Sequence, residues 1–302
     1  MDKKLSSFQT LVADGAMVLI ALVWGGGYPV TDYLLQHLSP LWVLAFRFSI
    51  SSVLLTLLFH RRLARLERSD LFGGALVGLL VALLFLCHVW GLKLSTPGKQ
   101  AFIAGTNVVI VPFLFALIYR RLPSSWALAG ATATTAGLLV MAFSPGMRFN
   151  AGDALSAAMA FLIALHFIAI GFFSRRMDPL ALTVIQIDVA CLVLVLSALA
   201  VEPFPGLRLA LPLWGAILFV SLGATVLAFL VQTVAQRYTP ETHAAILLAL
   251  ESPFGFLLAI LMGRDSWNVQ FALGGLLVMA GVILAEWESL ASPGPLRPKG
   301  EK

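Results

Sequence analysis

The sequence predicts an all-α integral membrane protein in which ten transmembrane helices form two inverted five-helix repeats around a central cavity. Three observations predict this fold: the composition, ten apolar runs of membrane-spanning length, and an order of motifs that occurs twice. Of the 302 residues, 60% are hydrophobic and 12% are charged, and the mean hydropathy is +0.94. Soluble domains are about half apolar and about a quarter charged, so this chain has more apolar surface than a soluble core can bury.

The ten apolar runs are separated by turn residues, among them Ser39-Pro40, Thr96-Pro97-Gly98 and Thr239-Pro240. A bilayer core of roughly 30 Å requires about 20 apolar residues per helix, because lipid cannot satisfy unpaired backbone groups. The first run follows Lys3 and Lys4 but lacks a small-residue cleavage site, so it is interpreted as a retained span. The expected helices are 14–35, 41–59, 71–92, 100–119, 126–143, 153–173, 180–200, 212–235, 242–262 and 270–288.

The basic residues are distributed unevenly between the loops. With a cytoplasmic N-terminus, fourteen of the 20 Lys and Arg residues lie on the cytoplasmic flank and five on the other, and Arg47 lies inside a helix. The positive-inside rule therefore predicts two cytoplasmic termini, in a multi-pass protein of the cell inner membrane. The segment 1–13 and the proline-rich tail 291–302, expected to be disordered, flank the helices. The basic residues that give the net charge of +5 lie in short clusters between the apolar runs. The positive charge therefore does not indicate nucleic-acid binding.

The two predicted halves, 14–145 and 146–290, contain the same features in the same order. Since each half has an odd number of helices, the second must enter the membrane from the opposite side. Inverted repeats of this kind occur in many secondary transporters, with the binding site between the halves near mid-depth. The matching features are Asp14 and Ser39-Pro40-Leu41 with Asp153 and Asp178-Pro179-Leu180 at an offset of 139, Thr96-Pro97 with Thr239-Pro240 at 143, and Gly130 and Gly137 with Gly274 and Gly281 at 144.

Five segments, in this order, resemble the drug/metabolite transporter superfamily in its EamA-type branch, and the resemblance extends from residue 14 to about residue 288. It implies an export-leaning carrier of amino acids or related metabolites, with YddG-like aromatic amino-acid exporters as one branch. The first half has Asn107 and Pro112 where the second has Glu251 and Pro253, at different spacings, so the halves are not interchangeable at the site. The segments are Trp24-Gly25-Gly26-Gly27-Tyr28-Pro29, Arg47, the run from Gln100 to Pro112, Glu251-Ser252-Pro253, and Gly274 to Gly281.

Polar side chains inside a bilayer require a partner, an interfacial position or a solvated cavity, so the few present here are candidates for a substrate site. Arg47 and Gln186 each stand seven residues after the proline that opens their helix. Arg47 is expected to bind a substrate carboxylate, to pair with Asp32, or to act as a structural lock between helices. Asp188 lies about 200° around the helix from Gln186. It is therefore expected either to couple protons or to form a hydrogen bond behind the cavity wall. The cavity candidates are Trp24, Tyr28, Arg47, His88, Asn107, His166, Gln186, Thr225, Gln232 and Glu251.

Glu251 and His166 are the further candidates for proton coupling. Glu251 precedes Pro253, which disturbs the helix, and its carboxylate could hold an ammonium group or a proton. His166 matches Gly27 at the offset of 139, so its side chain could cross a narrow gap. Ser221, Thr225, Ala228 and Gln232 would form one polar face of a regular eighth helix. The fifth and tenth helices carry no ionisable residue until Glu286 near the cytoplasmic end, and they are expected at the periphery or in a dimer contact.

The leading interpretation is a secondary transporter, monomeric or homodimeric, that exports apolar or aromatic amino acids by alternating access. A carrier of another metabolite or drug class, a membrane-embedded enzyme and a channel are the alternatives. The sequence has no HExxH or GxSxG motif, which disfavours an enzyme. It has no Walker-type nucleotide loop, so ATP is not expected to drive transport directly. Cys87 and Cys191 lie in apolar runs without ligand spacing, and neither a metal nor a cofactor is expected.

Overall fold

The computed structural model describes residues 7–63, 66–120, 122–142 and 150–291. Within these ranges every regular element is a helix. Two predicted features lie outside the described residues. They are the boundary between the two halves, at 145–146, and the disordered tail, of which Ala291 alone is described. The helices are α1 (Ser7–Leu35), α2 (Pro40–Leu63), α3 (Arg68–Lys93), α4 (Pro97–Gly105), α5 (Asn107–Tyr119), α6 (Ser125–Ala142), α7 (Ala151–Phe173), α8 (Pro179–Val201), α9 (Leu211–Leu218), the π-helix η1 (Phe219–Leu227), α10 (Ala228–Ala235), α11 (Glu241–Leu248), α12 (Glu251–Leu261) and α13 (Val269–Ala291).

Eight helical segments in the described part of the chain are long and apolar enough to cross a membrane, and two shorter apolar helices, Ser125–Met141 and Ala272–Ala285, accompany them. Large apolar side chains such as Leu57, Phe72 and Leu117 are exposed on the outside, whereas Arg47, Gln186 and Glu251 are buried. This distribution is the reverse of that in a soluble protein, and it fits a chain whose outer surface faces lipid.

Two of the expected helices are interrupted. The run 97–119 is divided into α4 and α5 at Thr106, and the run 241–261 into α11 and α12 at Ala249–Leu250. At the first break, the Thr106 hydroxyl donates to the Ile103 carbonyl at 2.6 Å and the Asn107 amide donates to the Ala104 carbonyl at 2.8 Å. These side chains satisfy carbonyls at the end of α4, which lipid could not do.

At the second break, Pro253 has no N–H to donate to the Ala249 carbonyl four residues earlier. The Ser252 N–H donates to that carbonyl instead, at 3.1 Å. Pro253 consequently lies in the first turn of α12, where a missing N–H costs little. The proline therefore allows the break, which falls ahead of Glu251 and leaves that residue at the beginning of a helix.

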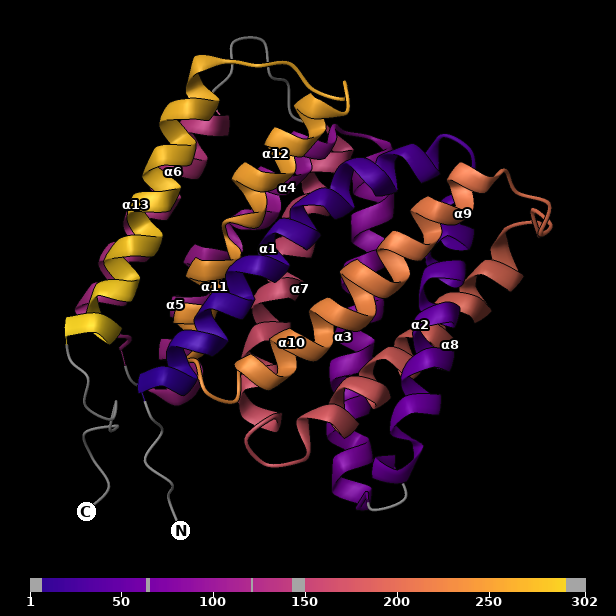
Figure 1. The fold of residues 1–302 in the computed structure, drawn as a ribbon, viewed down its shortest axis with the longest axis horizontal. Helices are drawn as coiled ribbons and strands as arrows, with labels where there is room; N and C mark the ends of the chain where they lie inside the picture. Colours follow the sequence, from indigo (N-terminus) through magenta and orange to yellow (C-terminus); the bar gives the residue numbers. More distant parts are fainter. Residues whose placement is uncertain (1–6, 64–65, 121, 143–149, 292–302) are drawn as a thin grey trace.

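Helices α6 and α13 lie side by side at one edge of the bundle (Figure 1). Their glycines permit this contact, because a Cβ atom on Gly137 would lie 2.6 Å from the Gly274 carbonyl and one on Gly281 2.7 Å from the Gly130 carbonyl. The start of α1 and the end of α13 lie at the same end of the bundle (Figure 1). The remaining helices form a core in which α1 contacts α12, α2 contacts α8, and α3 contacts α7 and α8.

Candidate functional site

A cavity lies among helices from both parts of the chain and encloses about 590 Å³ of space, including space open to solvent. Its walls are mainly apolar and aromatic with a few polar groups, as the walls of small-molecule sites usually are. The lining residues are Trp24, Gly27 and Tyr28 of α1, Arg47 of α2, Leu84, Phe85 and His88 of α3, Met159, Ile163, His166 and Phe167 of α7, Ala224 of η1, Phe229 of α10 and Glu251 of α12.

Arg47 is buried in the cavity wall and has no acidic partner among the residues that the structure describes. Its Nε donates to the Thr225 hydroxyl at 2.6 Å and its Nη2 donates to the Ala224 carbonyl at 3.0 Å. The guanidinium carbon lies 4.3 Å from the centre of the Phe85 ring, which adds a cation–π contact. Asp32 is the alternative partner expected from the sequence, but its Oδ2 lies 3.4 Å from Nη1 of Arg264 instead. That expectation is wrong, because Asp32 lies near the end of α1 and pairs with the α12–α13 loop.

The π-helix η1 positions the acceptors of Arg47. The Ala224 carbonyl also accepts a hydrogen bond from Trp24 Nε1, at 2.9 Å, and Thr225 Oγ1 donates to the Val220 carbonyl at 2.8 Å. The four residues expected on one polar face, Ser221, Thr225, Ala228 and Gln232, are all buried, but none of them lines the cavity. Ala224 and Phe229 line the cavity, whereas Gln232 is buried outside it with no hydrogen-bond partner among the described residues.

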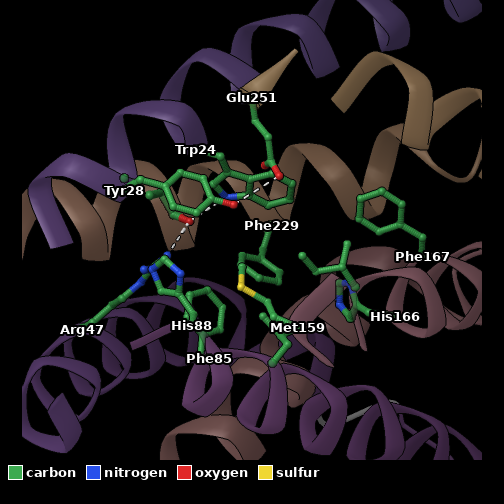
Figure 2. A pocket seen from close by; sticks show the side chains of 14 residues that line it. Trp24, Tyr28, Arg47, Phe85, His88, Met159, His166, Phe167, Phe229 and Glu251 are labelled. Carbon is green, nitrogen blue, oxygen red and sulfur yellow. Dashed lines mark hydrogen bonds between the residues drawn. The ribbon is translucent and has the colours of Figure 1, made fainter. Parts of the chain in front are cut away.

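Glu251 is the first residue of α12 and lies in the cavity wall opposite α3 (Figure 2). The Tyr28 hydroxyl donates to Glu251 Oε1 at 3.4 Å. The beginning of a helix carries a partial positive charge, which favours a carboxylate there. Discontinuous helices whose ends meet in the membrane are typical of ion and substrate sites in transporters. The break in the run 241–261 therefore supplies the cavity with an acidic group.

Two histidines line the cavity from different helices. The ring of His88 packs edge-on against Tyr28 and Phe85, at centroid distances of 5.3 and 5.8 Å. His166 Nε2 lies 3.0 Å from Gln186 Oε1, and Gln186 Nε2 donates to the Thr233 hydroxyl at 3.2 Å. Each imidazole is thereby held in one orientation.

The structure places six of the ten predicted cavity residues in the lining: Trp24, Tyr28, Arg47, His88, His166 and Glu251. Gln186 and Thr225 lie behind the wall and bond to lining residues, and Asn107 bonds to the end of α4. Asp188 lies outside the lining and accepts hydrogen bonds from Ser52 at 2.6 Å and from Thr56 at 2.9 Å. Of its two expected roles, this geometry fits the hydrogen bond behind the wall.

Sequence reasoning missed the apolar lining. Met159, Ile163 and Phe167 of α7, Phe85 of α3 and Phe229 of α10 carry no signal that separates them from packing residues in so apolar a chain. Helical spacing could have found some of them, since Met159, Ile163 and His166 follow one another on one face. In the described ranges, no group of three or more His, Cys, Asp or Glu residues could hold a metal ion.

A bundle of long apolar helices around a sparsely polar cavity is typical of multi-pass membrane transport proteins. The model of the EamA-like transporter family matches residues 11–143 and again 150–287, so the chain belongs to that family, within the drug/metabolite transporter superfamily. An uncharacterized transporter of Archaeoglobus fulgidus is 26% identical over 275 residues, covering 91% of this chain and 85% of the relative. One of Methanothermobacter thermautotrophicus is 26% identical over 238 residues, covering 74% and 67%.

The fold also occurs in a solved crystal structure. That chain superposes with a TM-score of 0.75 at 17% identity, with 95% of this chain and 99% of the other covered. The agreement over nearly the whole length of both chains shows a shared fold.

Proposed function

We propose that this transporter exports amino acids with apolar or aromatic side chains across the cell inner membrane by alternating access. The observation that carries the proposal is that one aromatic cavity holds both a buried arginine, which has no acidic partner in the described part of the chain, and a buried glutamate. A zwitterionic amino acid complements both groups and leaves no net charge to desolvate.

Arg47 is suited to the substrate carboxylate. A guanidinium has five N–H donors in a planar fork, and two of its nitrogens are engaged by Thr225 and Ala224. The remaining donors can bind a carboxylate, a group that guanidinium recognises in bidentate fashion. Because the existing bonds fix the orientation of the fork, little conformational entropy is lost on binding.

Glu251 is suited to the substrate ammonium group, with Tyr28 beside it. The same carboxylate is our first candidate for a coupling proton, since it lines the cavity whereas Asp188 is engaged by Ser52 and Thr56. The aromatic rings of Trp24 and Phe229, 5.6 Å apart, provide a surface for an apolar or aromatic side chain.

Alternating access is supported by the composition of the cavity wall. Residues 11–143 and 150–287 match the same family model, and both contribute to the lining. We infer that the two halves are oppositely oriented, that both termini are cytoplasmic, and that the halves rock about the cavity. A cysteine placed near either terminus and labelled from one side of the membrane would test this orientation.

Transport assays in proteoliposomes test the proposal. A panel of labelled amino acids should show saturable flux and counterflow, with the highest rates for apolar and aromatic members. Arg47→Ala should reduce the flux at least tenfold, whereas Arg62→Ala, which removes an exposed arginine of the same helix, should not. Flux without saturation or counterflow would identify a channel, and the absence of flux for every amino acid would overturn the proposed substrate class.

A further inference from the structure

We propose that His166 forms a second recognition point in the cavity, which selects substrates whose side chain carries a hydrogen-bond donor, such as a phenol or an indole N–H. Gln186 and Thr233 act as positioning residues that fix the protonated nitrogen of its ring. This inference rests on the proposed function: with the substrate's charged groups at Arg47 and Glu251, the side chain extends into the rest of the cavity.

Arg47 and His166 line different sides of the cavity. Figure 2 shows Arg47 with Tyr28 and His88 on one side and His166 with Phe167 on the other, and Phe229 and Met159 lie between them. The His166 ring stands edge-on to Phe229 at a centroid distance of 5.8 Å. An aromatic substrate side chain lying along Phe229 would therefore bring its far end to the imidazole.

The hydrogen bonds behind His166 define which ring nitrogen carries the proton. Gln186 Nε2 donates to the Thr233 hydroxyl at 3.2 Å, which turns Gln186 Oε1 toward His166 Nε2, at 3.0 Å. Because Oε1 can only accept, Nε2 must be the nitrogen that donates. A neutral imidazole has one N–H, so Nδ1 is left as an acceptor. His166, Gln186 and Thr233 are all buried, and this arrangement is shielded from bulk water.

Comparison of the two halves shows how the neutral recognition point at His166 differs from the charged one at Arg47. Arg47 and Gln186 correspond at an offset of 139 residues, as do Gly27 and His166. Arg47 reaches the cavity directly. Its counterpart Gln186 remains behind the wall and contacts His166, which lines the cavity at the position that corresponds to Gly27. The cavity thus has a cation at one end and a hydrogen-bond acceptor at the other, which orients an asymmetric substrate.

Substrate pairs that differ by one donor test the inference. We would compare the kcat/KM values for tyrosine and phenylalanine, and for tryptophan and 1-methyltryptophan, in proteoliposomes. Wild-type protein should prefer the donor-bearing member of each pair by about 3- to 10-fold, the range expected for one net hydrogen bond. In His166→Phe this ratio should fall to about one while phenylalanine transport persists. Gln186→Leu should lower the ratio partially, because Nε2 loses the acceptor that fixes the tautomer.

The ratio within one variant does not depend on how much protein is folded, so it separates recognition from a merely structural role. A structural role would reduce both members of a pair equally. His60→Phe and Gln36→Leu, matched changes at exposed positions, should leave the ratio unchanged. A wild-type ratio of one, or an unchanged ratio in His166→Phe or Gln186→Leu, would overturn the inference while leaving the proposed function in place. Absence of any amino-acid flux in wild-type protein would overturn the proposed function itself.

Discussion

The two interrupted helices use the same backbone arrangement for different purposes. Both α5 and α12 begin with a polar residue, Asn107 and Glu251, at positions 144 residues apart (251 − 107). Asn107 bonds to the end of the preceding helix and lies outside the cavity lining, whereas Glu251 reaches the cavity. The comparison teaches that a repeated fold can retain its helix breaks in both halves and place a cavity-lining side chain at only one of them.

The two breaks also contact each other. The Ser252 hydroxyl donates to the Ala101 carbonyl of α4 at 2.7 Å, and the rings of Phe102 and Phe256 stack at a centroid distance of 5.3 Å. Residues of both repeats therefore hold Glu251 in place. This gives the break in α4–α5 a structural role, even though its own polar residue does not reach the cavity.

The largest expected effect is that of Glu251→Gln. If Glu251 binds the substrate ammonium, the neutral amide leaves a buried cation without its partner, which costs about 3 kcal/mol. We therefore expect amino-acid kcat/KM in proteoliposomes to fall roughly a hundredfold. Glu67→Gln, at an exposed position before α3, is the matched control and should transport normally. A normal rate in Glu251→Gln would remove the functional difference between the two breaks.

The next effect concerns the contact between α1 and the second break. A Cβ atom on Gly25 would lie 2.7 Å from the Gly255 nitrogen and 2.9 Å from the Glu251 carbonyl, and neither backbone atom can turn aside. Gly25→Ala should therefore destabilise the protein by about 1–3 kcal/mol, measured as a lower Tm in detergent. Gly15, also in α1, has nothing within 4 Å of such an atom, so Gly15→Ala should maintain or raise the Tm. Equal Tm values for the two variants would contradict the close approach at the break.

The sequence predicted the helices well and the breaks poorly, for identifiable reasons. Apolar runs of spanning length and the prolines that open α2, α4 and α8 indicate the helices directly. The break before Glu251 lies four residues ahead of the proline that allows it, and η1 depends on hydrogen bonds from Arg47 and Trp24 on distant helices. Polar residues, which are energetically costly inside a bilayer, indicated much of the cavity lining. Thr225 and Gln232 were assigned to the lining on the assumption of a regular helix, and neither residue lines the cavity.

A smaller effect is expected from Ser252→Ala. This change removes the hydrogen bond that joins α12 to Ala101 of α4, which contributes about 1 kcal/mol in a buried setting. We expect a decrease of a few degrees in the Tm and a moderate loss of transport, because Glu251 is the neighbouring residue. Ser197→Ala is the control, since the Ser197 hydroxyl donates to the Val193 carbonyl of its own helix and joins no other helix in the described part of the chain. A similar change in both variants would show that contact between the breaks does not position Glu251.

The smallest effect on transport is expected from Asn107→Ala, the change at the position that corresponds to Glu251. The Asn107 amide donates to the Ala104 carbonyl and does not line the cavity, so its loss should lower the Tm slightly while kcat/KM changes less than about threefold. Measured beside Glu251→Gln, this variant compares the two breaks directly. A transport loss as large as that of Glu251→Gln, with the Tm preserved, would show that both breaks serve the substrate. In that case the first break would have to bring Asn107 into the cavity in another conformation of the transport cycle.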